Sequence, residues 1–357
     1  MTRRPTVRDL ICLTLLTILT CLTFRPGPVA AQEAVARYGS GPAPFLLRST
    51  TDISILGPVI ERFAAAEPGL TITFEQWGSN ALYDRARADC QGEGGVADAV
   101  FSSAVQQMVW LVNAACAAPY RSPATVALPE TRRWRDELWG ITTEPAVIVY
   151  NTRLLAGDEV PRSRFALLDA LRAQPDRYRG RIATYDIGAS GLGFLFAYAD
   201  SLEATTFGSM MEAFARVGAV ATCCSAEIIG GVAEGRYLIA YNVLGSYVAH
   251  AAAGEEVGTI LPEDYTLVLS RGYMIPRGAA QAEAAGRLLE FLLTPEAQGM
   301  LAAAGLVADM AAPETGLAPS ARRTIPLGPT LLVALDGNRR TQLLNLWGEA
   351  FQRAQAP

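Results

Sequence analysis

Hydrophobic and polar residues alternate along this chain with two different periods, one typical of strands and the other of helices. Leu70–Trp77 places an apolar residue at every second position over most of its length, which predicts a strand with one buried face. After Asp52, which can cap a helix, apolar residues recur at helical spacing as far as Phe63. A strand followed directly by a helix is therefore the basic unit that the pattern predicts.

Strands and helices are predicted in alternation over the rest of the chain. The further strands are residues 45–50, 97–101, 182–185, 237–241, 266–270 and 272–275, with an extended stretch at 140–150. The further helices are residues 79–91, 104–114, 164–174, 190–200, 207–217, 225–233, 279–293 and 295–304, with a last helical stretch around 343–347. This order indicates an α/β protein, and 357 residues are enough for roughly two domains.

The first 31 residues have the pattern of a secretory signal peptide. Three arginines precede a mostly apolar run from Leu10 to Phe24, and small residues at 29–31 lead to a possible cleavage point after Ala31. The run of about 15 residues is shorter than the roughly 18 to 20 that span a bilayer, and an uncleaved N-terminal anchor is the alternative. Lipid attachment at Cys21 is disfavoured by the bulkier Thr20 before it. We therefore expect export to the periplasm and a soluble mature chain.

Four cysteines remain after residue 31, and an oxidising compartment permits disulfides. Cys90 and Cys116 flank one predicted strand–helix unit, so they are a candidate pair. Cys223 and Cys224 are adjacent, and because a vicinal disulfide is strained we do not expect them to pair with each other. Buried free thiols are the alternative for all four.

The composition excludes several kinds of chemistry. The chain has no lysine, so its 30 basic residues are all arginine, and His250 is its single histidine. Lysine Schiff bases, a P-loop lysine and zinc sites with two histidines are therefore excluded. A net charge of −5 and a pI of about 5.2 argue against a nucleic-acid binder. Around Ser190, Leu192 stands where a nucleophile elbow requires glycine, and we expect a protein that is not an enzyme.

Three polar clusters each follow a predicted strand and open a predicted helix. They are Thr50-Thr51-Asp52, Ser102-Ser103 and Ser190-Gly191. A helix N-terminus presents free N–H groups and partial positive charge, and hydroxyl groups add donors, so such clusters suit an anionic ligand. The alternative for each cluster is simple capping of its own helix. Because ligands of open α/β sheets bind at the carboxyl ends of the strands, three clusters at such ends favour a shared site.

Five short segments, taken in order and spacing, resemble the ferric-iron-type branch of extracellular solute-binding proteins. Within that branch the chain is similar to a subgroup typified by the phosphoglycerate transport regulatory binding protein, over nearly all of residues 44–350. The segments that carry the resemblance are Ser49-Thr50-Thr51-Asp52, Phe101-Ser102-Ser103-Ala104, Glu144-Pro145-Ala146-Val147 with Tyr150-Asn151, Tyr185-Asp186 followed by Ser190-Gly191, and Tyr241-Asn242-Val243-Leu244-Gly245-Ser246-Tyr247.

The resemblance implies a type-2 periplasmic-binding-protein fold, α/β in class. Two lobes would be joined by a hinge of two crossing strands, with the ligand cleft between the lobes. Lobe one would comprise residues 44–143 and 268–357, and lobe two residues 144–267. The crossings would lie near Thr143–Ala146 and Pro262–Leu267.

The resemblance also implies a periplasmic receptor that needs no cofactor and captures a small anionic, carboxylate- or phosphate-bearing ligand. Its partner would be an inner-membrane ABC permease or a histidine-kinase sensor domain, and the receptor itself would be a monomer that binds no nucleic acid. The ligand-binding residues expected on this basis are Thr50, Thr51, Asp52, Ser102, Ser103, Glu144, Tyr185, Ser190, Gly191, Tyr241 and Asn242.

Ferric iron is the alternative ligand. Iron-binding members of the branch use tyrosine phenolates, commonly as a neighbouring pair, whereas the matching segment here separates Tyr241 from Tyr247. This departure disfavours a metal site, and we expect none.

Local groups have to attract an anion, because net charge does not. Without residues 1–31, 26 arginines and 34 acidic residues remain, a net charge of −8. Arg48 and Arg181 lie near predicted cleft clusters, where a guanidinium could clamp a carboxylate or phosphate, although both could equally be surface charges. Trp77 and Tyr185 are the aromatic residues that could line the cleft.

Overall fold

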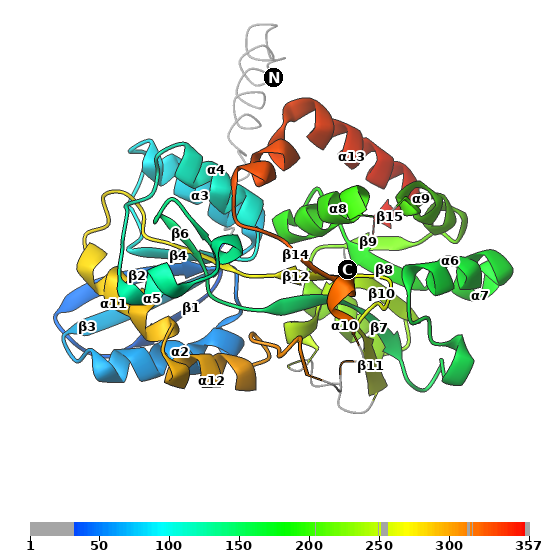
Figure 1. The fold of residues 1–357 in the computed structure, drawn as a ribbon, viewed down its shortest axis with the longest axis horizontal. Coiled ribbons are helices and arrows are strands. Elements are labelled where there is room, and N and C mark those ends of the chain that lie inside the picture. The colour runs from blue at the N-terminus through cyan, green and yellow to red at the C-terminus, as the bar shows by residue number, and fades with distance from the viewer. Residues whose placement is uncertain are drawn as a thin grey trace, which may run out of the picture. The chain divides into compact units, whose positions relative to one another are not determined.

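The computed structural model describes residues 32–203, 205–248, 250, 256–312, 315 and 317–353, with side chains as far as residue 351. The predicted signal peptide lies outside these residues. In the described part of the chain, no helix combines the length and the apolar character needed to cross a membrane. The described residues form two mixed β-sheets with helices packed on them, which confirms the α/β class (Figure 1).

Seven strands form the first sheet, which with its helices we call lobe one. Their spatial order is β1-β3-β2-β4-β13-β6-β5, and β2 pairs in parallel with both β3 and β4. The bounds are β1 Gln32–Tyr38, β2 Ala43–Ser49, β3 Leu70–Trp77, β4 Ala99–Ser102, β5 Arg133–Trp134, β6 Leu138–Gly140 and β13 Gly272–Met274. The helices are α2 Ile53–Ala66, α3 Ser79–Cys90, α4 Val105–Asn113, α5 Pro123–Ala127, α11 Ala282–Leu292 and α12 Pro295–Ala303.

The apolar pattern explains how lobe one packs. In β3, the predicted strand, Leu70, Ile72 and Phe74 are buried while the residues between them are partly exposed. These side chains join one apolar core with α2, α11 and α12, and α3 and α4 belong to a second core on the other face of the sheet (Figure 1). Burial of this kind of apolar surface is worth about 25 cal/mol per Å².

The second sheet, with its helices, is lobe two. Its order is β14-β12-β7-β10-β8-β9-β15, and β11 also pairs with β7. The bounds are β7 Glu144–Asn151, β8 Ile182–Tyr185, β9 Val220–Thr222, β10 Ile239–Leu244, β11 Val257–Ile260, β12 Thr266–Leu269, β14 Arg322–Thr324 and β15 Gln352–Arg353. The helices are α6 Arg164–Ala173, α7 Pro175–Tyr178, α8 Gly191–Glu203, α9 Phe207–Arg216, α10 Ser225–Ala233 and α13 Gly337–Ala350.

The chain passes between the two sheets at more places than the sequence predicted. The first crossing joins β6 to β7 near the predicted position, and the second joins β12 to β13 at Ser270–Arg271, after the predicted range. The C-terminal segment differs from the prediction that all of 268–357 belongs to lobe one. Strands β14 and β15 pair with β12 and β9 of lobe two, and Trp347 of α13 is buried in the core of that lobe.

A buried ion pair lies where the first two crossings run side by side. Both side chains, Arg271 and Glu144, are 0% exposed, and the guanidinium bonds both carboxylate oxygens, at 2.8 and 3.1 Å. Hydroxyl groups of Thr51, Thr142 and Ser246 bond the same two charges. Burial is the largest single influence and lowers the pKa of Arg271, but Glu144 and Tyr247 together raise it by more, so the net pKa lies above the ordinary value. We call these five residues the crossing network.

Candidate functional site

A cavity of about 290 Å³ lies between the two lobes. Its volume is at the small end of the range for ligand pockets, about 300 to 1,000 Å³. Lobe one contributes the wall residues Glu33, Thr50, Asp52, Gln76, Trp77, Gly78, Ser79 and Ser103. Lobe two contributes the wall residues Tyr185, Ala189, Ser190, Leu192, Cys223, Cys224, Ser225, Ala226 and Tyr247. Five of the eleven expected ligand-binding residues are therefore in its lining: Thr50, Asp52, Ser103, Tyr185 and Ser190.

Hydroxyl groups of two predicted clusters meet in the wall of lobe one. The hydroxyl oxygens of Thr50 and Ser103 lie 3.2 Å apart, and Thr50 Oγ1 also accepts the backbone N–H of Ser103 at 2.9 Å. Thr50 directly follows β2 and Ser103 directly follows β4. These two strands are parallel neighbours in the sheet, so they bring the two residues together. The sheet topology therefore accounts for the prediction that the Thr50 and Ser103 clusters share a site.

The wall of lobe two is centred on Tyr185 and the start of α10. The Tyr185 hydroxyl lies 2.6 Å from Ser225 Oγ and accepts the backbone N–H of Leu244 at 3.2 Å. Burial raises the pKa of Tyr185, and it also raises that of Tyr247, so both phenols stay neutral. The N-cap residue of α10, Cys224, makes no side-chain capping bond to the helix. Cys224, Ser225 and Ala226, which we call the α10 start, all line the cavity.

Two sets of hydrogen bonds join the lobes beside the cavity. On one side, Asn80 donates to the carbonyl oxygens of Gly188 and Ala189, at 3.0 and 2.9 Å. Ser79 Oγ accepts the Gly191 N–H at 2.8 Å. On the other side, the Tyr247 hydroxyl donates to Asp52 Oδ1 at 3.1 Å and contacts Thr50 O at 3.4 Å. Residues of both connections line the cavity, Ser79 and Ala189 from the first and Thr50, Asp52 and Tyr247 from the second.

The start of α8, one of the three predicted clusters, uses two of its N–H donors, those of Gly191 and Gly193, within the protein. Ser190 Oγ accepts the Gly193 N–H at 3.0 Å and so caps its own helix. The Gly191 N–H is taken by lobe one, and Gly191 does not line the cavity. Capping, the alternative interpretation of the sequence, therefore describes this cluster.

Three further expected residues stabilise the fold from outside the cavity lining. Thr51 and Glu144 belong to the crossing network, and both are fully buried. Ser102 Oγ accepts the N–H of Ala104 at the beginning of α4. These polar side chains have hydrogen-bond partners inside the protein, so no ligand is needed to explain why polar residues occur at these positions.

Tyr241 and Asn242 also lie outside the lining, in the interior of lobe two. The Arg164 guanidinium is 1% exposed, and it bonds the Tyr241 hydroxyl at 2.8 Å, Asn242 Oδ1 at 3.1 Å and Asp200 at 3.0 Å. The Tyr241 hydroxyl in turn donates to Asp200. The tyrosine that the sequence matched to iron ligands is thus committed to a buried ion pair.

Neither arginine suggested for the cleft lines the cavity. Arg48 bonds Glu75 at 2.8 Å and also pairs with Asp89. Arg181 donates to the carbonyl oxygen of Gly235 at 2.9 Å. Among the described lining residues there is no arginine, whereas Glu33 and Asp52 contribute two carboxylates.

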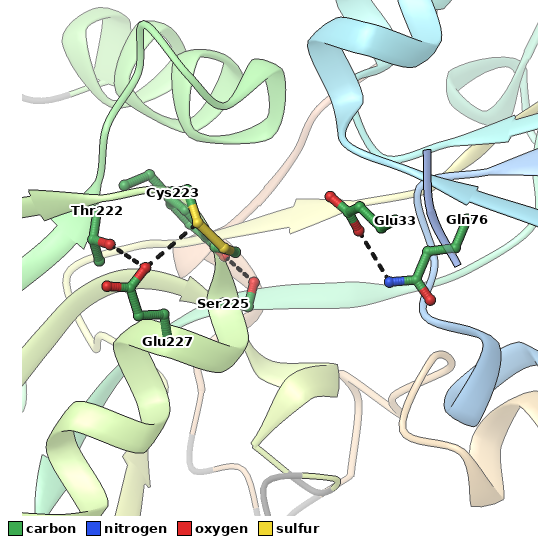
Figure 2. Close-up of a disulfide and its surroundings, with 8 residues drawn as sticks. Glu33, Gln76, Thr222, Cys223, Ser225 and Glu227 are labelled. Carbon is green, nitrogen blue, oxygen red and sulfur yellow. Dashed lines mark hydrogen bonds between the residues drawn. A yellow bond between two sulfur atoms is a disulfide. The ribbon is translucent and has the colours of Figure 1, made fainter. Parts of the chain in front are cut away.

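The sequence missed the fourth polar cluster, Thr222-Cys223-Cys224-Ser225. Its first residue ends β9 and its last residue opens α10, but a strand of three residues is too short to show a period. Figure 2 shows Cys223 and Ser225 facing Glu33 and Gln76 across the cavity. Glu33, on β1, was missed too because no strand was predicted before residue 45.

Both cysteine pairs form disulfides in the structure. Cys90–Cys116 is the candidate pair, with Cα atoms 5.3 Å apart. Cys223–Cys224 is a vicinal disulfide, which corrects the expectation that these two do not pair. The expectation considered strain alone, whereas the junction from β9 to α10 holds both sulfurs together. Cys223, Cys224 and Glu227 lie close enough to bind a metal, but the disulfide occupies the two thiols.

The fold and the cavity together define a two-lobed solute-binding protein. The chain belongs to the family described as bacterial extracellular solute-binding proteins, whose model matches residues 49–299. Its structure is similar to that of the substrate binding protein of an ABC transporter from Agrobacterium tumefaciens. The sequences are 31% identical, the match covers 90% of this chain and 99% of that chain, and the TM-score is 0.83.

Two more distant structures show the same fold. Iron-bound HitA from Pseudomonas aeruginosa is 16% identical over 87% of this chain and 99% of that chain, with a TM-score of 0.66. AfuA from Actinobacillus pleuropneumoniae, with fructose-6-phosphate bound, is 13% identical over 87% and 99%, with a TM-score of 0.67. A search of curated proteins found no match.

These likenesses confirm the two-lobed type-2 fold and place the chain among the solute-binding proteins of ABC transporters. Members of this family are extracellular or periplasmic transport receptors that work with ABC permeases, and the family is not a class of enzymes. The narrower subgroup, the signal peptide and the monomeric state stay predictions.

Proposed function

We propose that this protein captures a small solute with an anionic group, a carboxylate or a phosphate, in the cavity between the lobes and delivers it to an ABC permease. The observation that carries the proposal is the α10 start. There the first turn of a nine-residue helix lines the cavity, and its N-cap residue makes no side-chain capping bond. Free N–H groups at such a position carry partial positive charge and bind anionic oxygens.

Hydroxyl groups surround the α10 start and add donors. Ser225 and Tyr185 form a bonded pair in the wall, and Tyr247 lies on the same side of the cavity. The starts of α2 and α8 offer fewer free N–H donors. Gln76 Oε1 accepts the Ile53 N–H of α2 at 2.9 Å, and Ser79 of lobe one accepts the Gly191 N–H of α8. An anionic group therefore finds its best partners at α10.

Ferric iron is the second candidate, supported by the Tyr185, Tyr247 and Asp52 oxygens that line the same cavity. The raised pKa values of the two tyrosines oppose it, because a phenolate is the form that binds iron. A sensor kinase as an alternative partner stays a prediction from the resemblance.

A thermal-shift screen with inorganic phosphate, sugar phosphates, small carboxylates and ferric citrate tests the proposal. A solute that binds only the folded state adds about 2.7 kcal/mol of stability at a hundred times its Kd. We expect organic anions to raise the melting temperature. A shift with ferric citrate, but with neither free citrate nor the other anions, would support the iron site instead.

The variant Ser225→Asp tests the position of the anionic group. A carboxylate at the α10 start repels the ligand and competes for the same N–H groups, so we expect affinity to fall about a hundredfold, or about 2.7 kcal/mol. Ser54→Asp is the matched control, since it makes the same change in the exposed first turn of α2, outside the cavity lining. Unchanged affinity in Ser225→Asp would remove the α10 start from the site.

A further inference from the structure

We infer that the captured solute is a zwitterion, with a cationic ammonium group bound by Asp52 in addition to the anionic group at the α10 start. The inference rests on the proposed function for the anionic half of the ligand. The cationic group of the ligand is inferred from the distribution of charge over the two walls of the cavity.

The two walls differ in charge. Lobe one brings Asp52 and Glu33 to the lining, whereas the described lining residues of lobe two carry no ionisable carboxylate or guanidinium. Figure 2 shows Glu33 and Gln76 on one side of the cavity and the Cys223–Ser225 segment on the other. A ligand with only negative charge would have to approach both carboxylates, and the repulsion is stronger at Asp52, which is the less exposed of the two.

The nearest guanidinium groups do not offset these two carboxylates. Arg271 lies 5.7 Å from the centre of the Tyr247 ring, but Glu144 neutralises it through two hydrogen bonds. Arg48 lies 5.8 Å from the Trp77 ring and is paired with two carboxylates, those of Glu75 and Asp89. The charge that faces the ligand on this wall is therefore negative.

The Asp52 side chain does not cap α2, although its position at the start of that helix predicts that it would. Asp52 is the N-cap residue of α2, yet its side chain makes no capping bond, and Gln76 Oε1 takes the Ile53 N–H in its place. Among the described residues, the Tyr247 hydroxyl is the one group that bonds the Asp52 carboxylate, through Oδ1. The remaining carboxylate acceptor positions are open to a ligand donor, and a charged ammonium is the strongest such donor.

Glu33 provides weaker support at the exposed side of the cavity. Its carboxylate accepts a bond from Gln76 Nε2 at 3.0 Å and is otherwise open to solvent. Solvent screens a carboxylate in this position, so it attracts a cationic group without holding it strongly. The class of ligand that fits both walls is a small solute with a primary ammonium at one end and a carboxylate or phosphate at the other.

Calorimetric titration with matched probes tests the inference. One set is 2-aminoethyl phosphate, ethyl phosphate and ethylamine, and the other is β-alanine, propionate and propylamine. In each set the first probe carries both charges and the other two carry one each. We expect one of the zwitterions to bind at least about tenfold more tightly than either of its single-charge counterparts, as a charge-assisted hydrogen bond supplies.

Three variants locate the ammonium. Asp52→Asn keeps the shape of the side chain and an oxygen that can accept the Tyr247 hydroxyl, so thermal unfolding should be unchanged. We expect this variant to lose the advantage of the zwitterion over the anion-only probe. Glu33→Gln should reduce that advantage by about twofold. Glu61→Gln, an exposed change on α2 outside the lining, should leave it unchanged.

The outcomes separate the inference from the proposed function. If ethyl phosphate or propionate binds as tightly as its zwitterion and Asp52→Asn has no effect, the zwitterion inference is wrong and the anion-binding function stands. If ethylamine or propylamine binds as tightly as its zwitterion, the anionic group contributes nothing and the proposed function is wrong as well. If neither zwitterion binds, the zwitterion inference is wrong.

Discussion

Two polar regions lie between the lobes, and they are built in opposite ways. In the crossing network, Arg271 and Glu144 are completely buried and every hydroxyl around them has a partner in the network. At the α10 start, the N-cap residue makes no side-chain capping bond, and the first residues of the helix line a cavity. The comparison teaches that a dense polar cluster between two lobes is not by itself a binding site. The deciding property is whether its donors and acceptors are already used.

The largest effect that we predict concerns the crossing network. Glu144→Gln leaves the Arg271 charge buried without its counter-ion, and breaking a buried pair in this way costs about 3 to 5 kcal/mol. We therefore expect the free energy of unfolding, measured by urea denaturation, to fall by about that amount.

The exposed pair Arg287–Glu67 offers a matched control for this change. It is also an arginine with two bonds to one glutamate, at 2.8 and 3.0 Å, but the Arg287 side chain is 48% exposed. Glu67→Gln should cost no more than about 1 kcal/mol. Equal losses in the two variants would show that the crossing network is solvated, and the contrast with the α10 start would then fail.

The second prediction applies the same comparison to the two disulfides. Cys90–Cys116 closes a loop with a sequence separation of 26 and belongs to lobe one, whereas Cys223–Cys224 joins adjacent residues in the cavity wall. In the chain-entropy model a loop of the first size is worth about 3.5 kcal/mol, and a loop of adjacent residues restricts the unfolded chain very little. We expect the double serine variant of Cys90 and Cys116 to lose about 3 kcal/mol of stability.

The double serine variant of Cys223 and Cys224 should lose less than about 1 kcal/mol. Its effect should appear in solute affinity, because the change alters the surface of the α10 start. A large loss of stability in this variant, with normal affinity, would assign the vicinal disulfide to the fold.

The sequence predicted local structure well where strands and helices were long enough to show a period. The strands at 70–77 and 182–185 have the predicted bounds, and so does the helix at 225–233. Periodicity failed for β9, β14 and β15, which have three, three and two residues. These short strands owe their place to pairing with distant segments, and this pairing is what moves the C-terminal segment to lobe two.

The candidate site was predictable in part for the same reason. Thr50 and Ser103 directly follow the neighbouring strands β2 and β4, and the sheet brings them together. The pattern around Ser190 is the same, yet its donors are used by Ser79 and by its own helix. A single sequence gives the position of a helix start but not the side chains that reach it from the other lobe, so Ser190 and Ser225 could not be told apart.

The smallest predicted effect separates these two serines. Ser190→Ala removes the cap of α8, and Ser225→Ala removes the hydroxyl bonded to Tyr185, so each should cost about 1 kcal/mol of stability. Only Ser225→Ala should weaken binding of the solute found in the screen, by about tenfold, because Ser225 stands at a helix start whose N-cap residue makes no capping bond, whereas Ser79 and Ser190 accept the Gly191 and Gly193 N–H groups at the start of α8. Thermal unfolding and calorimetric titration of both variants measure the two quantities separately. If Ser190→Ala weakens binding as much as Ser225→Ala does, the α8 start belongs to the site, and satisfied hydrogen bonds would not be the property that divides structural from ligand-binding clusters in this protein.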